Sequence, residues 1–291
     1  MLNPDRPPRC HGPVRAALRC FLLAASAVPL PGPGLPGQPV PGTPAPAAPP
    51  PLLADAFNKL MENQGHWAYT QAQSVAGLTA GMKRETVLRV DPSRPYAEQF
   101  RPLVFEGEPP TAQKLEEFRA LGERAARRRL RDERRSPEHS GDELQISLNF
   151  QVVTPDLAHA VEVTEDGRSV TYDVPLRKRG SGGGSAFPMF QVTARVNRQR
   201  REFEHATIRQ RTPMRLELAA RVTDAEIDCE FTPVDPNFPS VITGETQRAS
   251  VRILFVKREL SFEMRRSDFR RVTPYDDRFG VKVGPIRTIQ F

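Results

Sequence analysis

Few residues of this 291-residue chain have the types and spacing that catalysis or metal binding requires. The five histidines never occur at metal-ligand spacing, and no Ser-His-Asp order, Cys-His pair or His-Glu-x-x-His motif is present. The glycine-rich run 180–185 lacks the lysine of a phosphate-binding loop, the glycine spacing of a dinucleotide fingerprint and a following helix. The sequence therefore predicts a protein that is not an enzyme, with no cofactor and no metal site.

One cysteine could in principle act as a nucleophile. Cys229 is the only cysteine after residue 27, so loss of an N-terminal leader would leave no partner for an internal disulfide bond. It lies on the apolar side of an alternating segment, between Asp228 and Glu230. These carboxylates disfavour the thiolate that a nucleophile needs, so the pattern predicts a buried structural thiol.

The basic residues suggest a different kind of chemistry, the binding of anions. The formal net charge is +7, and without residues 1–27 the chain keeps 38 basic and 34 acidic residues, a net charge of +4. The densest basic cluster contains Arg127, Arg128, Arg129 and Arg131, which could contact an anionic membrane surface or glycan. No aromatic stacking platform is interleaved with these arginines, so nucleic acid is not an expected partner.

The first 27 residues have the pattern of a cleaved signal peptide. Four arginines, Arg6, Arg9, Arg15 and Arg19, precede the apolar run 20–27, and Ala25-Ser26-Ala27 fits the small-x-small cleavage rule. The alternative, an uncleaved membrane anchor, would need roughly twenty apolar residues. We therefore expect an exported, periplasmic protein that is cleaved near Ala27.

Residues 28–51 have the composition of a tether. About half of the residues from Pro29 to Pro51 are proline, which favours extended polyproline II and cannot build a packed core. The folded domain is expected to occupy residues 52–291.

The folded part begins with mixed elements. A helix is predicted over 51–61, extended segments over 67–69, 86–90 and 100–105, and a second helix over 111–135, with Thr111 as its N-cap.

From residue 144 onward apolar and polar residues follow almost entirely the two-residue period of β-strands. Apolar and polar residues alternate over 144–152, and Asp166-Gly167 is a hairpin signal. Ten or eleven antiparallel strands and two helices are expected in all. The fold class predicted is mainly β with two helices (α+β), built on one large curved antiparallel sheet, because no crossover helices alternate with the strands.

This order of elements resembles a superfamily of exported proteins. A signal peptide, a short amphipathic helix, a Trp-containing first strand, a central helix and a long run of antiparallel strands are similar to the periplasmic lipoprotein carriers of the LolA and LppX type and the related sensor RseB. The segment 105–111 (Phe-Glu-Gly-Glu-Pro-Pro-Thr), followed by Leu-Glu-Glu-Phe at 115–118, resembles uncharacterised exported proteins of that shape. The resemblance covers residues 54–291 as topology. It implies an open half-barrel covered by helices, whose concave apolar face holds acyl chains.

Large apolar side chains on the strands are the candidate ligand contacts. Six residues are expected to line the concave face: Trp67, Leu148, Phe150, Phe190, Phe255 and Phe262. The function expected is non-enzymatic binding of a lipid, a lipoprotein or another apolar ligand. The alternative is an envelope structural or interaction module whose barrel is filled by its own side chains and which uses sheet edges and the arginine helix.

Overall fold

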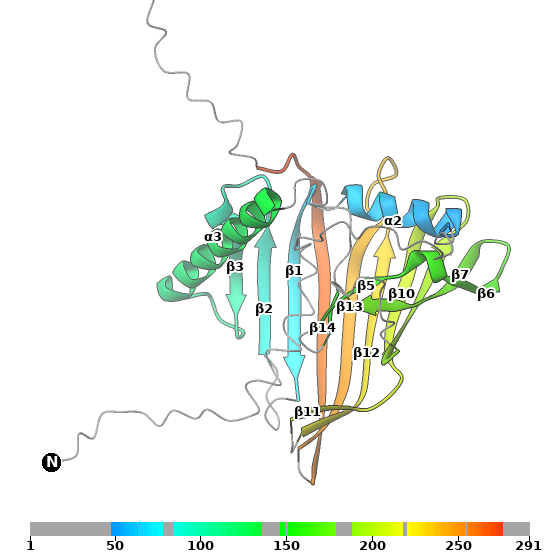
Figure 1. Cartoon of the computed structure of the whole chain (residues 1–291). Coiled ribbons are helices and arrows are strands. Elements are labelled where there is room, and N and C mark those ends of the chain that lie inside the picture. The colour runs from blue at the N-terminus through cyan, green and yellow to red at the C-terminus, as the bar shows by residue number, and fades with distance from the viewer. Residues whose placement is uncertain are drawn as a thin grey trace, which may run out of the picture.

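The fold combines one large antiparallel sheet with two helices (Figure 1). It is described from a computed structural model, over residues 48–63, 65–77, 84–135, 146–148, 151–178, 188–217, 220–253 and 255–275. The sheet does not close into a barrel, and the predicted α+β class is confirmed. The predicted signal peptide and most of the predicted tether, together with the glycine run 180–185 and residues 276–291, lie outside the described residues. No helix in the part described is long and apolar enough to cross a membrane.

Eleven strands form the large sheet. Its order is β3-β2-β1-β14-β13-β12-β10-β9-β7-β6, and β11 pairs with β12. The bounds are β1 Trp67–Ala76, β2 Arg84–Val90, β3 Phe100–Phe105, β6 Val161–Glu165, β7 Ser169–Val174, β9 Phe190–Asn197, β10 Glu202–Gln210, β11 Met214–Glu217, β12 Ala220–Thr232, β13 Val241–Ile253 and β14 Val256–Arg271. Short 3-10 turns, η1 (Tyr96–Glu98) and η2 (Leu157–His159), lie between strands.

At the centre of the sheet, the first strand of the described chain pairs with the last. Strand β1 pairs with β14, and Trp67 lies opposite Arg271. The two backbones approach closely at Gly77, where φ is +89° and a Cβ atom would lie 1.8 Å from the carbonyl oxygen of Glu259. Only glycine fits this position, because it tolerates both the positive φ and the contact.

Helix α2 (Pro51–Asn63) packs on β9 and β10. Its residues Leu53 and Ala56 are buried in one hydrophobic cluster with Val192, Val196 and Phe203. Polar contacts at the helix edge add to this packing, since Lys59 Nζ donates a hydrogen bond of 2.6 Å to the carbonyl oxygen of Arg200. The predicted short amphipathic helix therefore covers the part of the sheet formed by β9 and β10.

Helix α3 (Ala112–Arg135) covers the opposite end of the sheet. The backbone N–H of Lys114 donates to Thr111 Oγ1 at 3.3 Å, which confirms the predicted N-cap. The rings of Phe118 and Phe105 lie 6.5 Å apart, and Lys114 Nζ lies 4.5 Å from the centre of the Phe105 ring.

Both helices lie on the same face of the sheet. Directly paired residues of antiparallel strands point to one side, so the pairing can be followed from strand to strand. The row that contains Gln73, Met264 and Glu245 continues to Phe105 beneath α3 and to Ala194 beneath α2. We call this helix-covered side the inner face.

A second sheet corrects two expectations. Strands β4 (Ile146–Leu148), β5 (Gln151–Pro155) and β8 (Leu176–Lys178) form a separate three-stranded sheet. The predicted single strand over 144–152 is therefore wrong, because the chain reverses and Leu148 pairs with Gln151. Val153 and Leu176 are buried in the same cluster as Leu53, which places this small sheet over the inner face near α2. With it, the described residues hold fourteen strands rather than ten or eleven.

Candidate functional site

The inner face of the central strands carries a buried apolar surface. Phe262 and Met264 of β14 are 3 % and 1 % exposed, and Ala249 and Val251 of β13 are also buried. None of the four belongs to the hydrophobic cluster that includes α2. The apolar inner face therefore extends beyond the part that α2 covers.

An aromatic cluster lies where α2 ends above β1 and β14. The Trp67 ring meets the rings of Phe238 and Phe269 edge to face, at centroid distances of 5.7 and 6.2 Å. The Arg271 guanidinium lies 5.2 Å from the Trp67 ring and 4.3 Å from the Phe238 ring, and it donates a hydrogen bond to Asn63 Oδ1 at the end of α2. This cluster ties α2 to the centre of the sheet.

A polar band crosses the inner face between these apolar regions. It consists of Gln71, Gln73, Glu245, Gln247 and Arg266. Arg266 Nε donates to Gln71 Oε1 at 3.3 Å, and Gln71 Nε2 donates to Gln73 Oε1 at 3.3 Å. Gln247 Nε2 donates to Glu245 Oε1.

Gln247 is the most buried member of this polar band. It is 0 % exposed and is paired with Phe262 on one side and Ile227 on the other. Its Oε1 has no hydrogen-bond partner. A buried acceptor without a donor costs about 1–3 kcal/mol, so this oxygen marks a place where a donor would stabilise the protein.

Burial also changes the acidity of the groups beside Gln247. It raises the pKa of Glu245, and the hydrogen bond from Gln247 and the charge of Arg266 only partly offset this effect. Burial, with the nearby charge of Glu245, raises the pKa of the Cys229 thiol to about 12. The inner face is therefore an environment that disfavours anions.

The raised pKa of Cys229 predicts an inert thiol. At pH 8 an aromatic disulfide reagent should modify native protein roughly a thousandfold more slowly than protein in denaturant, because the thiolate fraction falls tenfold per unit of pKa. Absorbance of the released thiol measures both rates. Equal rates in the two states would contradict a buried structural thiol.

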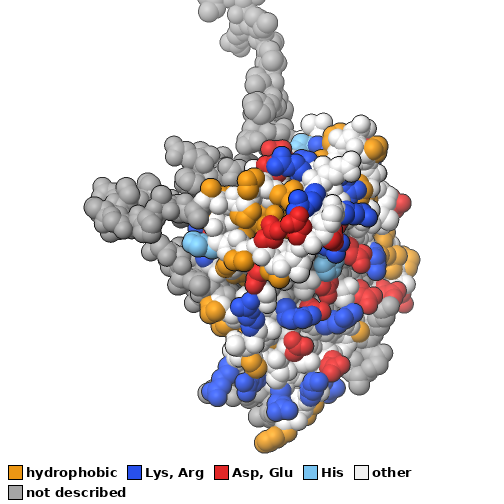
Figure 2. Space-filling model, turned by 90° about the vertical axis from the view of Figure 1, so that its right-hand side faces the viewer, with side chains coloured by type: hydrophobic (Ala, Val, Ile, Leu, Met, Phe, Trp, Pro, Cys, Tyr) orange, Lys and Arg blue, Asp and Glu red, His pale blue; other side chains and the backbone are white. Residues whose placement is uncertain are grey.

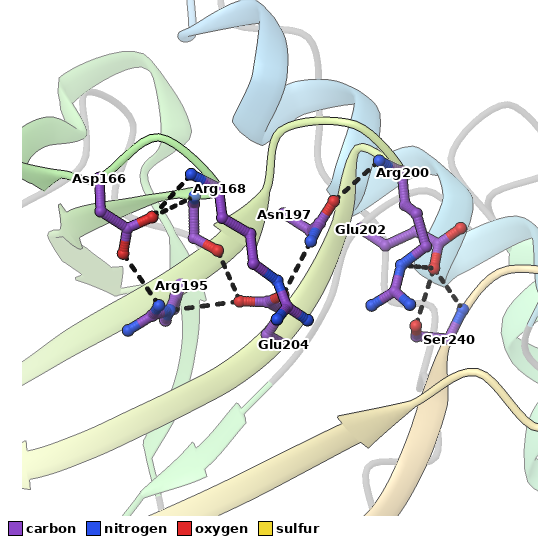
Figure 3. Close-up of polar contacts among 9 residues, drawn as sticks. Asp166, Arg168, Arg195, Asn197, Arg200, Glu202, Glu204 and Ser240 are labelled. Atoms are coloured by element: carbon purple, nitrogen blue, oxygen red, sulfur yellow. Dashed lines mark hydrogen bonds and ion pairs between the residues drawn. The ribbon is translucent and has the colours of Figure 1, made fainter.

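A second polar cluster lies at the β9–β10 hairpin (Figure 3). Glu204 accepts hydrogen bonds from Ser169 Oγ at 2.7 Å, Asn197 Nδ2 at 2.8 Å and Arg195 Nε at 3.2 Å. Partial burial alone would raise the pKa of Glu204, but these hydrogen bonds outweigh it and the pKa lies below its usual range. An ionised carboxylate held by these donors joins β7, β9 and β10 and is suited to structure rather than to proton transfer.

The outer face of the sheet is covered by opposite charges. Cross-strand ion pairs join Arg209 to Glu226, and Arg265 to Glu230 at 3.1 Å. On the β6 and β7 side of the molecule, Figure 2 shows acidic and basic side chains interspersed. This mixture is expected for a solvated surface. Within the described residues no group of His, Cys, Asp and Glu could hold a metal ion.

The structure brings together only part of the predicted ligand-contact set. Trp67, Phe190 and Phe262 all lie on the inner face and are buried. Phe255 is a correction: it lies in the turn between β13 and β14, 98 % exposed, rather than on the apolar side of a strand. Leu148 lies in the small sheet and not in the large one, and Phe150 lies outside the described residues.

The predicted arginine cluster belongs to α3. Arg127 is exposed and pairs with Glu123 Oε2 at 2.8 Å, one helical turn away. Arg128, Arg129 and Arg131 follow it within α3, and their side chains lie outside the described residues.

Sequence reasoning missed Glu245 and Gln247. Both lie on β13 at the spacing of Ala249 and Val251, which are buried on the same face. Polar residues that continue the alternation of an apolar face are the signal that could have found them.

Comparison of the chain with protein-family models, with curated proteins and with solved structures finds no match.

Proposed function

We propose that the chain is an exported, non-enzymatic binding protein that holds a lipid, a lipoprotein or another apolar ligand on the inner face of its open sheet. The observation that carries the proposal is the open antiparallel sheet, whose inner face bears the apolar side chains of Phe262, Met264 and Val251 between the regions that α2 and α3 cover. An apolar molecule that replaced the present cover of these side chains would contact β13 and β14, and burial of its surface would drive binding.

Native mass spectrometry of protein purified from a bacterial envelope tests this proposal. The expected spectrum shows a chain that starts near Val28 together with a non-covalent adduct, and solvent extraction should release a lipid. Protein refolded from denaturant should lack the adduct and regain it when envelope lipid is added. Absence of an adduct before and after lipid addition would contradict ligand binding.

The second candidate function is an envelope interaction module. It is favoured by Val161 and Val163 on the edge strand β6, which are 61 % and 57 % exposed, and by the burial of Trp67, Phe190 and Phe262. An edge strand presents unpaired backbone groups that another chain can extend. In this case the inner face would be filled and the purified protein would carry no lipid.

The arginine cluster of α3 supports a further contact, with an anionic membrane surface. Replacement of Arg127, Arg128, Arg129 and Arg131 by glutamine should weaken association with phosphatidylglycerol vesicles several-fold at low salt, because attraction by exposed charges is screened by ions. Vesicle co-sedimentation at increasing salt measures this.

The matched control removes four exposed basic residues of the sheet, Arg101, Arg248, Arg252 and Lys257. This variant should retain vesicle binding. If the wild-type protein does not sediment with vesicles at any salt concentration, the cluster is only a solvated helix face.

A further inference from the structure

One row of side chains near the end of the large sheet is basic on every strand that it crosses. Arg215 of β11 is paired with Arg221 of β12, and Arg221 is paired with Arg252 of β13. Arg252 is paired in turn with Lys257 of β14. All four residues are exposed, and we call them the basic row. They belong to the lower end of the sheet in Figure 1, where Figure 2 shows Lys and Arg side chains gathered.

The basic row lies on the outer face of the sheet. The next pair along β12 and β13 is Val222 with Val251, and both side chains are buried on the inner face. Because successive residues of a strand point to opposite faces, Arg221 and Arg252 point outward to solvent. Neighbouring strands lie about 4.8 Å apart, so the row is roughly 14 Å long and runs across the strands.

The charges of the basic row are not balanced as they are elsewhere on the outer face. There, cross-strand pairs join basic to acidic residues, as in Arg209 with Glu226. The three arginines of the row form no ion pair within the described residues, and Lys257 alone is paired, with Glu259 at 3.0 Å. Like charges directly opposite each other destabilise a sheet. The row is therefore an unfavourable arrangement that a bound anion would relieve.

The shape of the basic row favours a linear polyanion. A single small anion would meet one guanidinium, whereas a chain with regularly spaced charges can meet every member of the row. A planar bilayer that contacted the row would also meet the carboxylates of Asp224 and Glu259, which the neighbouring row presents on the same face. A polymer that lies along the row avoids them.

The chemistry of the row narrows the polymer further. A guanidinium binds a carboxylate through two parallel N–H donors, and three of the four members are arginine. Each sugar of an extended acidic polysaccharide advances the chain by roughly the spacing of neighbouring strands, about 4.8 Å. Successive uronate carboxylates can therefore follow successive strands.

We propose that the basic row binds an extended acidic polysaccharide, which lies across β11 to β14 with a uronate carboxylate at each basic side chain. This site goes beyond the apolar ligand proposed for the inner face. It uses the opposite face of the sheet and different residues, so each proposal holds or fails without the other.

Calorimetric titration of the full chain with tetragalacturonate tests this proposal. The oligosaccharide carries one carboxylate on each sugar, and its methyl ester is the same molecule without the charges. The wild-type protein should bind the ester at least about tenfold more weakly than the acid, because the ester offers no charge to the row. Digalacturonate, which reaches only half of the row, should bind several-fold more weakly than the tetramer.

A double variant assigns the binding to the row. Arg221→Gln together with Arg252→Gln removes the two central charges and should weaken binding of tetragalacturonate about three- to tenfold. The stability of this variant in urea should be unchanged or raised, because two like charges no longer oppose each other.

The matched control is Arg209→Gln together with Arg265→Gln. It removes the same charge from arginines of the outer face that already pair with carboxylates. This variant should keep the wild-type affinity in about 0.1 M salt, where the Debye length of about 10 Å screens charges outside the row.

Several results would overturn the proposal. Equal binding of the acid and the ester, or an equal loss of affinity in both double variants, would show that the row does not recognise the polymer. If the wild-type protein does not bind tetragalacturonate, but sediments with phosphatidylglycerol vesicles through Arg221 and Arg252, the row is a membrane contact instead. The lipid content of the purified protein should be the same in both double variants, which separates this test from that of the inner face.

Discussion

Replacement of Phe262 by alanine is expected to lower the free energy of unfolding by about 3–5 kcal/mol, the range for a buried phenylalanine whose removal leaves a cavity. Phe262 is 3 % exposed and lies between Val75 and Gln247 on the inner face. Urea denaturation followed by circular dichroism measures the change. If the ligand contacts this ring, the co-purifying lipid should decrease in the same variant.

Phe255 provides a matched control. It is the same residue type, seven positions earlier in the chain and 98 % exposed. Phe255→Ala should change stability by less than about 0.5 kcal/mol and leave lipid content unchanged, because exposed side chains away from special features contribute little. A small loss at both positions would contradict the burial of Phe262.

Among glycine-to-alanine replacements in the described sheet, Gly77→Ala should be the most damaging. The new Cβ would lie 1.8 Å from the carbonyl oxygen of Glu259, and the backbone would stay at a φ of +89°. Left-handed strain and overpacking together should cost about 2–4 kcal/mol, and the β1–β14 pair should separate at this end. Chemical denaturation measures the loss, and hydrogen exchange of the amides of β1 locates it.

Gly65 separates the two causes. Its φ is +78°, and nothing lies within 4 Å of its Cβ position. Gly65→Ala should therefore cost only the conformational term, about 1–2 kcal/mol. A Gly77→Ala variant no less stable than Gly65→Ala would show that the contact with Glu259 is relieved without cost.

Elements with a strong local signal were predictable from the sequence. The helix over 51–61, the N-cap at Thr111 and the strand over 100–105 appear in the structure nearly as the residues indicated. Each depends on neighbours in the chain: an amphipathic period, a hydroxyl before a helix, or a run ended by glycine and proline.

Elements that depend on distant partners were not predictable. Alternation over 144–152 does not reveal where the chain reverses, so the β4–β5 hairpin was read as one strand. Residues 243–248 of β13 bring no apolar side chain to either face, and this segment forms a strand because β12 and β14 pair with it on either side. Phe255 carries no local mark that distinguishes a turn from a strand end.

The same limit applies to the candidate site. The sequence identified Trp67, Phe190 and Phe262 by residue type, and all three lie on the inner face. Gln247 looked like an ordinary surface residue, because only the register against Phe262 and Ile227 shows that it is enclosed by hydrocarbon.

The pairing of β1 with β14 also determines when the fold can be completed during synthesis. Trp67 meets Arg271, so nearly the whole chain must have left the ribosome before the first strand finds its central neighbour. Contacts of such long sequence separation carry a large loop-closure entropy and slow the folding of β proteins. Among the described strands, β1 to β3 are bound to the rest of the sheet only through β14. The sheet of a nascent chain with this topology therefore stays in two parts until β14 has been made.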